Sequence, residues 1–167
     1  MTYYVLDTSV YGVLVDRNEK DYGIVKNVIE YAKENRERFL TTFIISKELH
    51  SEGVDKHIRD IILPRYYETI SKDKAPLEIL FSEGHGLVEK LAWNYIQRLE
   101  KKVADEVKDD VLNYAWASVA GVDAFVTRNR RGILAESYWK TLEKSNRKMG
   151  LSFVKIISPT KFHESMP

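Results

Sequence analysis

Short apolar runs along the chain predict five β-strands. They lie at residues 3–6, 39–45, 77–81, 123–127 and 153–157, and they carry β-branched, leucine or aromatic side chains between polar or glycine-containing stretches. The run at 3–6 is apolar on consecutive positions, which is typical of a central strand that is covered on both faces. The run at 77–81 is expected to be a short edge strand.

Apolar residues at helical spacing fill most of the segments between these strands. The pattern predicts helices at residues 10–15, 21–35, 53–63, 87–103, 110–120 and 133–148, and a further helix that starts at Ser46. We expect Pro64 to end its helix, residues 65–75 to form a polar loop, and Gly121 to cap the end of the helix before it. Alternating strands and helices favour parallel strands joined by right-handed crossovers. The sequence therefore predicts an α/β fold, with residues 1–167 as a single three-layer α/β/α sandwich around a central, mostly parallel five-stranded sheet.

Composition narrows the possible chemistry. The 167 residues are 44% hydrophobic, which is enough for one well-covered core. No apolar run approaches the ~18 residues of a membrane span, and the N-terminal segment lacks the basic region and leader of a signal peptide, so we expect a soluble, cytoplasmic protein. There is no cysteine, and the four histidines form no HxxxH pair, so a metal ion would have to be held by oxygen atoms. The net charge of +1 does not by itself indicate a nucleic-acid-binding protein.

Polar side chains stand at the ends of several predicted elements. Asp7 follows the first strand, and Glu48 lies in the first turn of the helix that starts at Ser46. Asp110 starts the helix that leads to the fourth strand, and Asn129 lies just past that strand. Because ligands of open α/β sheets bind at the carboxyl ends of the strands, we expect these four side chains to meet at one edge of the sheet.

Each acid also has a simpler explanation. Asp7 could cap the helix that follows it. Asp109 could cap the helix at 110–120, and Asp110 could be the first residue of that helix. Glu48 could be an exposed glutamate that the helix macrodipole favours, and for this residue viewed alone we prefer that simpler interpretation. The residues taken one by one therefore leave both interpretations open.

Three carboxylates at one edge would favour a particular chemistry. They repel one another, and a divalent cation would most naturally keep them ionised. Mg²⁺ and Mn²⁺ prefer a few carboxylates and waters, which leaves positions for phosphate oxygens. The chain has no P-loop, GxGxxG or GxSxG motif, so the usual signatures of nucleotide triphosphatases, dinucleotide enzymes and α/β-hydrolases are missing. The pattern therefore favours metal-assisted hydrolysis of phosphodiesters.

Several segments occur in an order and at a spacing that together are fairly specific. They are YVLDTSV near the N-terminus, the glutamate within SKEL, DVLNYAWASVAGVDAFVTRN, and FVKIISPTKF near the C-terminus. With them the chain resembles the PIN-domain nucleases, and the resemblance runs nearly from end to end. It implies a PIN-like α/β/α fold and a nuclease activity.

The resemblance also implies roles for individual residues. Asp7, Glu48 and Asp110 match the metal-binding acids, and Asn129 holds the fourth position, where many members of the family have an aspartate. A neutral fourth ligand lowers the charge of the site by one, which leaves open whether one or two metal ions bind. Asp109, next to Asp110, is an alternative third ligand.

Four neighbouring residues are expected to position substrate or water. These are Thr8, Ser9, Thr127 and Arg128, the last being part of a basic cluster beside the site. By the resemblance the protein is a Mg²⁺- or Mn²⁺-dependent endoribonuclease that leaves a 5′-phosphate.

Many PIN proteins of bacteria and archaea are VapC-type toxins, usually homodimers that a small antitoxin protein inhibits. The resemblance extends to these partners, although the polar segment 65–76 and the basic helix 133–148 are longer than expected of minimal toxins. Two alternatives are a PIN-like RNA-binding or RNA-processing module without cleavage, and a DNA-directed nuclease of the same fold.

Overall fold

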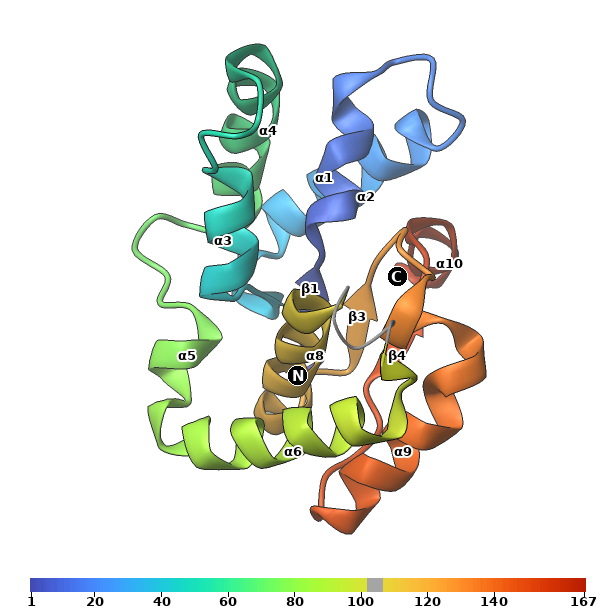
Figure 1. The fold of residues 1–167 in the computed structure, drawn as a ribbon. Coiled ribbons are helices and arrows are strands. Elements are labelled where there is room, and N and C mark those ends of the chain that lie inside the picture. The colour runs from blue at the N-terminus through green and yellow to red at the C-terminus, as the bar shows by residue number, and fades with distance from the viewer. Residues whose placement is uncertain (102–106) are drawn as a thin grey trace.

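A four-stranded parallel sheet lies at the centre of the computed structural model, which describes residues 1–101 and 107–167 (Figure 1). Its strands are β1 (Tyr4–Leu6), β2 (Phe39–Leu40), β3 (Ala124–Val126) and β4 (Lys155–Ile157). They stand in the order β2-β1-β3-β4, and all three neighbouring pairs are parallel. The predicted parallel arrangement of the strands is therefore confirmed.

Helices cover the first face of this sheet through aromatic contacts. Tyr4 of β1 lies opposite Phe39 of β2, and both rings contact Phe162 of helix α10 (Pro159–Ser165), with ring centroids 4.9 and 6.1 Å apart. Helix α2 (Tyr22–Glu34) packs beside α10 on the same side. These buried rings fix α10 against the sheet.

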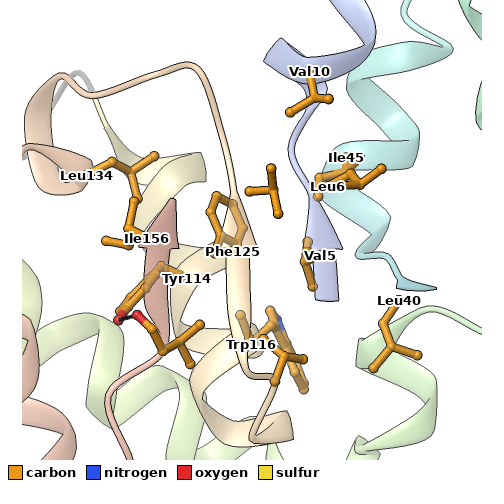
Figure 2. Packing of buried hydrophobic residues seen from close by; sticks show 14 of the residues in the cluster. Val5, Leu6, Val10, Leu40, Ile45, Tyr114, Trp116, Phe125, Leu134 and Ile156 are labelled. Carbon is orange, nitrogen blue, oxygen red and sulfur yellow. Dashed lines mark hydrogen bonds between the residues drawn. The ribbon is translucent and has the colours of Figure 1, made fainter. Parts of the chain in front are cut away.

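The second face is covered by helix α8 (Lys108–Ala120). Tyr114 of α8 lies against Phe125 of β3, with ring centroids 6.3 Å apart, as Figure 2 shows. Ala115 and Ala117 of α8 are fully buried, and such small side chains let the helix approach its neighbours closely. Gly121 ends α8 in the left-handed conformation, with φ of 68°, as predicted. Helices thus lie on both faces, and the α/β class is confirmed.

The remaining elements surround this core. They are α1 (Thr8–Gly12), η1 (Val13–Val15), η2 (Arg36–Arg38), α3 (Phe43–Leu49), α4 (Lys56–Thr69), α5 (Leu77–Leu80), η3 (Ser82–Gly84), α6 (His85–Arg98), η4 (Gly132–Leu134), η5 (Glu136–Tyr138) and α9 (Trp139–Lys148). Helix α6 runs across α8 and α9 (Figure 1) and buries Val88, Leu91 and Tyr95 of the helix predicted at 87–103. Val103, the last residue of that predicted helix, lies outside the described residues. Among residues 1–101 and 107–167, no helix has both the length and the apolar character that a membrane crossing requires.

The prediction of a strand at residues 77–81 is wrong, so the described part of the sheet has four strands and not five. The segment forms helix α5, which starts after Pro76. Leu77 is buried, and its backbone N–H donates to Thr41 O at 2.9 Å, while Ile79 and Leu80 are about half exposed. An apolar run of this length fits a buried strand or one turn of helix equally well, so its pattern could not decide.

The strand predicted at 39–45 is also shorter than expected. It ends at Leu40, and helix α3 begins at Phe43, three residues before the predicted start. Thr42 caps α3, because its hydroxyl accepts from Ile45 N at 3.1 Å. Glu48 therefore lies in the last turn of α3 and not in its first.

Helix α4 continues through Pro64 to Thr69, where the sequence predicted a loop from residue 65. The side chains of Ile62, Tyr66 and Thr69 are buried at helical spacing, and Tyr66 packs edge-on against Tyr11 with ring centroids 5.6 Å apart. This burial outweighs the unfavourable proline. The helix predicted at 133–148 is instead two 3₁₀ turns followed by α9.

Replacement of Pro64 tests this correction. A proline in a helix interior destabilises the folded state by roughly 3 kcal/mol. Proline also restricts the unfolded chain, and the loss of this restriction on replacement lowers the stability by up to about 1 kcal/mol. We therefore expect Pro64→Ala to raise the free energy of unfolding by about 1–2 kcal/mol in urea titrations followed by circular dichroism. An unchanged or lowered value would mean that the helix ends at residue 63, as the sequence pattern predicted.

Candidate functional site

Asp7 is the first residue of the site, and it follows β1 directly. Its backbone N–H donates to Val126 O at 2.9 Å, so the ladder between β1 and β3 extends one residue further. The residue is 5% exposed and stands at the N-cap position of α1, yet its side chain makes no capping hydrogen bond. Instead, the hydroxyls of Ser9 and Thr127 both donate to Asp7 Oδ2 at 2.8 Å. The capping explanation therefore does not account for this carboxylate.

Glu48 approaches from α3. Thr8, the first residue of α1, donates from its hydroxyl to Glu48 Oε2 at 2.5 Å. Because Glu48 lies in the last turn of α3, the macrodipole disfavours its negative charge there. The simpler explanation of Glu48 as a glutamate favoured by its helix is therefore removed.

Asp110 and Asn129 complete the group. Asp110 lies in the first turn of α8 and is partly buried, and the side-chain amide of Asn129 donates to Asp110 Oδ2 at 3.2 Å. The neighbouring Asp109 is exposed. Helix α8 starts at Lys108 with Val107 at its N-cap, so neither aspartate is the cap that the sequence allowed for.

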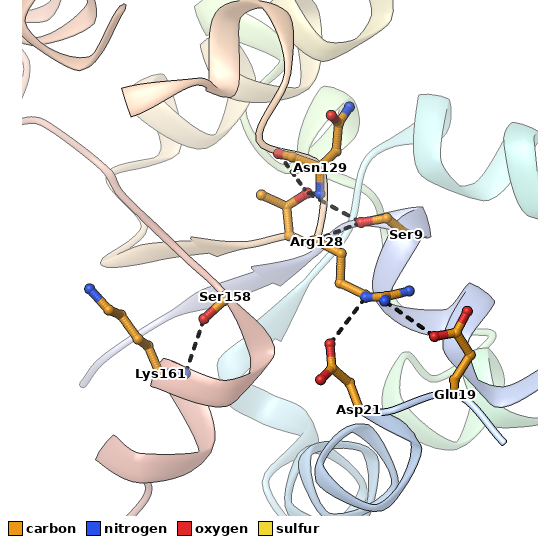
Figure 3. A network of polar contacts seen from close by, with 8 residues as sticks. Ser9, Glu19, Asp21, Arg128, Asn129, Ser158 and Lys161 are labelled. Atoms are coloured by element: carbon orange, nitrogen blue, oxygen red, sulfur yellow. Dashed lines mark hydrogen bonds and ion pairs between the residues drawn. The ribbon is translucent and has the colours of Figure 1, made fainter. Parts of the chain in front are cut away.

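The segment after β3 is held to α1 by hydrogen bonds from several atoms, some of which Figure 3 shows. Arg128 N donates to Ser9 Oγ at 3.0 Å, and Asn129 N donates to Thr127 Oγ1 at 2.9 Å. Asn129 Oδ1 in turn accepts from Arg131 N at 3.0 Å. Ser9 and Thr127 thus join Asp7 to the backbone that carries Asn129, and their predicted role in positioning substrate or water stays a prediction.

The guanidinium of Arg128 lies elsewhere. Its Nε is 3.4 Å from Asp21 and its Nη2 is 3.5 Å from Glu19, both at the approach to α2 (Figure 3). The structure therefore brings the Arg128 backbone to the site but pairs its charge with a different part of the fold.

The carboxylates influence one another strongly. Burial, followed by the charges of Asp7, Glu48 and Asp109, raises the pKa of Asp110 from 3.8 to about 7, against a lowering by the Asn129 hydrogen bond. Burial also raises the pKa of Glu48, and the charges of Asp7 and Asp109 add to this rise, while the Thr8 hydrogen bond lowers it. The site therefore concentrates negative charge that the fold does not neutralise.

No cationic side chain offsets this charge in the part of the chain that the structure describes. None of its ion pairs involves Asp7, Glu48 or Asp110. Residues 1–101 and 107–167 also contain no group of three or more aspartate, glutamate, histidine or cysteine side chains that are close enough together to hold a metal ion. The carboxylates therefore share one electrostatic environment without forming a finished coordination cage.

The donor set fits a hard divalent cation by its chemistry. It consists only of carboxylate and amide oxygens, and its mutual repulsion is the kind that a cation relieves. Asp7, Glu48 and Asp110 would hold the ion, with Asn129 as a neutral fourth donor.

The sequence analysis missed a buried polar contact behind the site. Thr42 Oγ1 donates to Asn113 Oδ1 at 2.6 Å, which joins the start of α3 to α8 one turn beyond Asp110. Asn113 is 1% exposed, and its amide nitrogen has no hydrogen-bond partner among the described residues. An asparagine within an apolar, alanine-rich helix was the signal that could have indicated this contact.

Comparisons with protein-family models, curated proteins and solved structures find no match to this chain. The resemblance to PIN-domain nucleases therefore stays a prediction, which the segments quoted above carry.

Removal of one charge tests the repulsion. The raised pKa means that folded Asp110 keeps a proton which the unfolded chain releases near its ordinary pKa of 3.8. The protonated Asp110 therefore stabilises the folded protein fully below about pH 4, and this stabilisation is lost as the pH rises through about 7. Each pKa unit corresponds to about 1.4 kcal/mol before solvent screening, so we expect Asp110→Asn to be about 1–2 kcal/mol more stable than the wild type at pH 8 in EDTA.

The pH dependence provides the control. In urea unfolding, the gain from Asp110→Asn should be small at pH 5 and should grow towards pH 8. Asp109→Asn, which changes an exposed carboxylate in the same helical turn, should show a much weaker trend. A gain that is independent of pH, or a loss of stability at pH 8, would contradict the proposed repulsion.

Proposed function

We propose that this protein is a Mg²⁺- or Mn²⁺-dependent endoribonuclease of PIN-domain type. The proposal is carried by one observation at the ends of β1 and β3, where side chains from four separate parts of the chain interact. The charge of Asp7 adds to the raised pKa of both Glu48 and Asp110. Asn129 donates a hydrogen bond to Asp110. This is the place where open α/β sheets bind their ligands. The sequence resemblance assigns these same four residues to the metal site of a nuclease.

The chain's own residues would prepare the site for hydrolysis. Ser9 and Thr127 hold Asp7 Oδ2 by hydrogen bonds, which fixes the orientation of the carboxylate. Thr8 orients Glu48, and Asn129 orients Asp110. When bound, the metal ion would polarise the phosphodiester and make the attacking water more acidic. The raised pKa of Asp110 belongs to the metal-free site, and a bound cation would lower it by favouring the ionised carboxylate.

A second candidate function is RNA binding without cleavage. It is favoured by two observations, the neutral Asn129 at the fourth position and the lack of a finished metal cage in residues 1–101 and 107–167. A DNA-directed nuclease of the same type is the third. The toxin role, the small antitoxin and the homodimer follow from the family resemblance alone and stay predictions.

A cleavage assay separates these functions. We expect labelled single-stranded RNA to be cut in Mg²⁺ or Mn²⁺ with 5′-phosphate ends, and EDTA or Asp7→Asn to slow cleavage by more than about 100-fold. Asp7→Asn keeps an oxygen that can accept from Ser9 and Thr127, so circular dichroism should show an intact fold. Comparison of Asp109→Asn with Asp110→Asn identifies the third ligand. Equal behaviour of the metal, EDTA and Asp7→Asn samples would contradict a nuclease, and a preference for matched DNA would contradict the assigned substrate.

The fourth position is tested by Asn129→Asp. A fourth carboxylate should strengthen Mn²⁺ binding in calorimetry by about tenfold or more, because it adds a negative ligand to the site. The same variant should be less stable than the wild type in EDTA, since one more charge joins the repulsion. If the wild type neither binds Mn²⁺ nor cleaves, and Asn129→Asp gains both, the non-cleaving function is supported. Unchanged Mn²⁺ affinity would remove Asn129 from the ligand set.

A further inference from the structure

A pocket of about 200 Å³ lies between α3, α4 and the segment 71–76, away from the carboxylates. Phe43, Tyr66 and Tyr67 are among the residues that line it. Lys72 and Lys74 line it as well. Helices α3 and α4 stand next to each other at this place (Figure 1).

A second, more open hollow adjoins the first. The two share Phe43, Ser46 and Tyr67, and the second adds Lys47 and His50. Phe43, Ser46, Lys47 and His50 follow one another at helical spacing, so they share one face of α3 and its C-terminal end. We call the surface formed by Phe43, Lys47, His50, Tyr67, Lys72 and Lys74 the aromatic–lysine surface.

One aromatic ring of this surface is exposed, and another is half-buried and held in place. Phe43 is 50% exposed, which is uncommon for so large an apolar side chain. The Tyr67 ring packs edge-on against Tyr66 and His50, with centroid distances of 5.4 and 5.6 Å. The Tyr67 hydroxyl hydrogen-bonds His50 Nε2, and His50 Nδ1 bonds the carbonyl oxygen of Ser46 at 2.6 Å. A ring fixed in this way loses little freedom when a flat ligand stacks on it.

The surface carries three lysines. In the described residues, no ion pair involves Lys47, Lys72 or Lys74. Lys74 Nζ donates to the carbonyl oxygen of Arg36 at 2.7 Å, and Lys72 Nζ lies 4.9 Å from the centre of the Tyr67 ring. An exposed ring and a half-buried ring, beside lysines that make no ion pair in the described residues, match the flat bases and the phosphates of an unpaired nucleic-acid strand.

We propose that the aromatic–lysine surface binds single-stranded RNA, with an unpaired base stacked on Tyr67 or Phe43 and the neighbouring phosphates on the lysines. An exposed cation–π contact is weaker than base stacking, so a base can displace Lys72 from the Tyr67 ring and leave its ammonium group for a phosphate. The bases of a duplex are already stacked on one another, so a paired strand cannot use this surface in the same way.

The choice of RNA rests on the proposed function. Glu48 lies on α3 next to Lys47, on a different face of the same helix from the aromatic–lysine surface. A strand that binds the surface can therefore continue around α3 towards the carboxylates. The surface would then act on the substrate of the proposed site without taking part in the chemistry.

Binding in EDTA tests the proposal without cleavage. Fluorescence anisotropy with labelled oligouridine should show that Phe43→Ala and Tyr67→Leu each weaken binding by about tenfold, because each removes one stacking ring. Tyr67→Phe keeps the ring and should bind within about twofold of the wild type. Trp93→Leu changes a ring that is 60% exposed on α6, and it should have no effect. Lys47→Gln and Lys72→Gln should each reduce the slope of log affinity against log salt by about 0.7.

Several results would overturn the proposal. Wild-type affinity of Phe43→Ala and Tyr67→Leu, or equal competition by duplex RNA, would remove the stacking surface, and equal binding of single-stranded DNA would remove the assignment to RNA. Melting curves of Phe43→Ala and Tyr67→Phe provide the check on folding. Mn²⁺ calorimetry separates this inference from the proposed function. If the protein is not a metal-dependent nuclease but the surface binds RNA, the wild type binds oligouridine and no Mn²⁺. If the aromatic–lysine surface does not bind RNA, Mn²⁺ binding is intact and the ring variants bind RNA like the wild type.

Discussion

The hydrogen bonds of Ser9 and Thr127 to one oxygen of Asp7 are the interaction on which the candidate site depends. Asp7 is almost completely buried, so water cannot stabilise its charge, and these two hydroxyls replace part of that hydration. Because Thr127 follows β3 and Ser9 belongs to α1, the same bonds tie the ends of β1 and β3 together. Burial raises the pKa of both Glu48 and Asp110, and the neighbouring carboxylate of Asp7 adds to each rise.

The fold holds these mutually repelling groups in place through contacts elsewhere. Thr42 and Asn113 join α3 to α8 by a buried hydrogen bond, and Ile45 and Val111, which neighbour the acids in their own helices, are fully buried. Burial of apolar side chains stabilises by about 25 cal/mol per Å², so a few such residues outweigh the repulsion of one carboxylate. Local rules that are broken at one place and compensated around it are typical of functional sites.

The sequence predicted the positions of Asp7 and Asn129 after two strands of the sheet better than it predicted the elements around them. Asp7 and Asn129 could be placed because each follows a strongly apolar run, and the carboxyl ends of parallel strands share one edge of the sheet. The wrong assignments at 77–81 and 65–75 concern segments whose state depends on distant partners, such as the packing of Tyr66 on Tyr11. The pairing of Arg128 with Glu19 and Asp21 spans more than a hundred residues, so no local pattern contains it.

Helix α3 connects the candidate site with the aromatic–lysine surface, and its own fixation makes that connection rigid. The carboxylate of Glu78, which is 8% exposed, accepts from Phe43 N with both oxygens, at 3.0 and 2.9 Å. This charge at the first turn of α3 complements the positive end of the helix, whereas Glu48 opposes the negative end. Glu78 thus satisfies a backbone N–H that the first turn of α3 leaves unpaired, and it fixes the end of the helix that carries Phe43. Because Glu48 lies in the last turn of the same short helix, Phe43 and Glu48 keep a constant separation, which suits the binding of one strand by both.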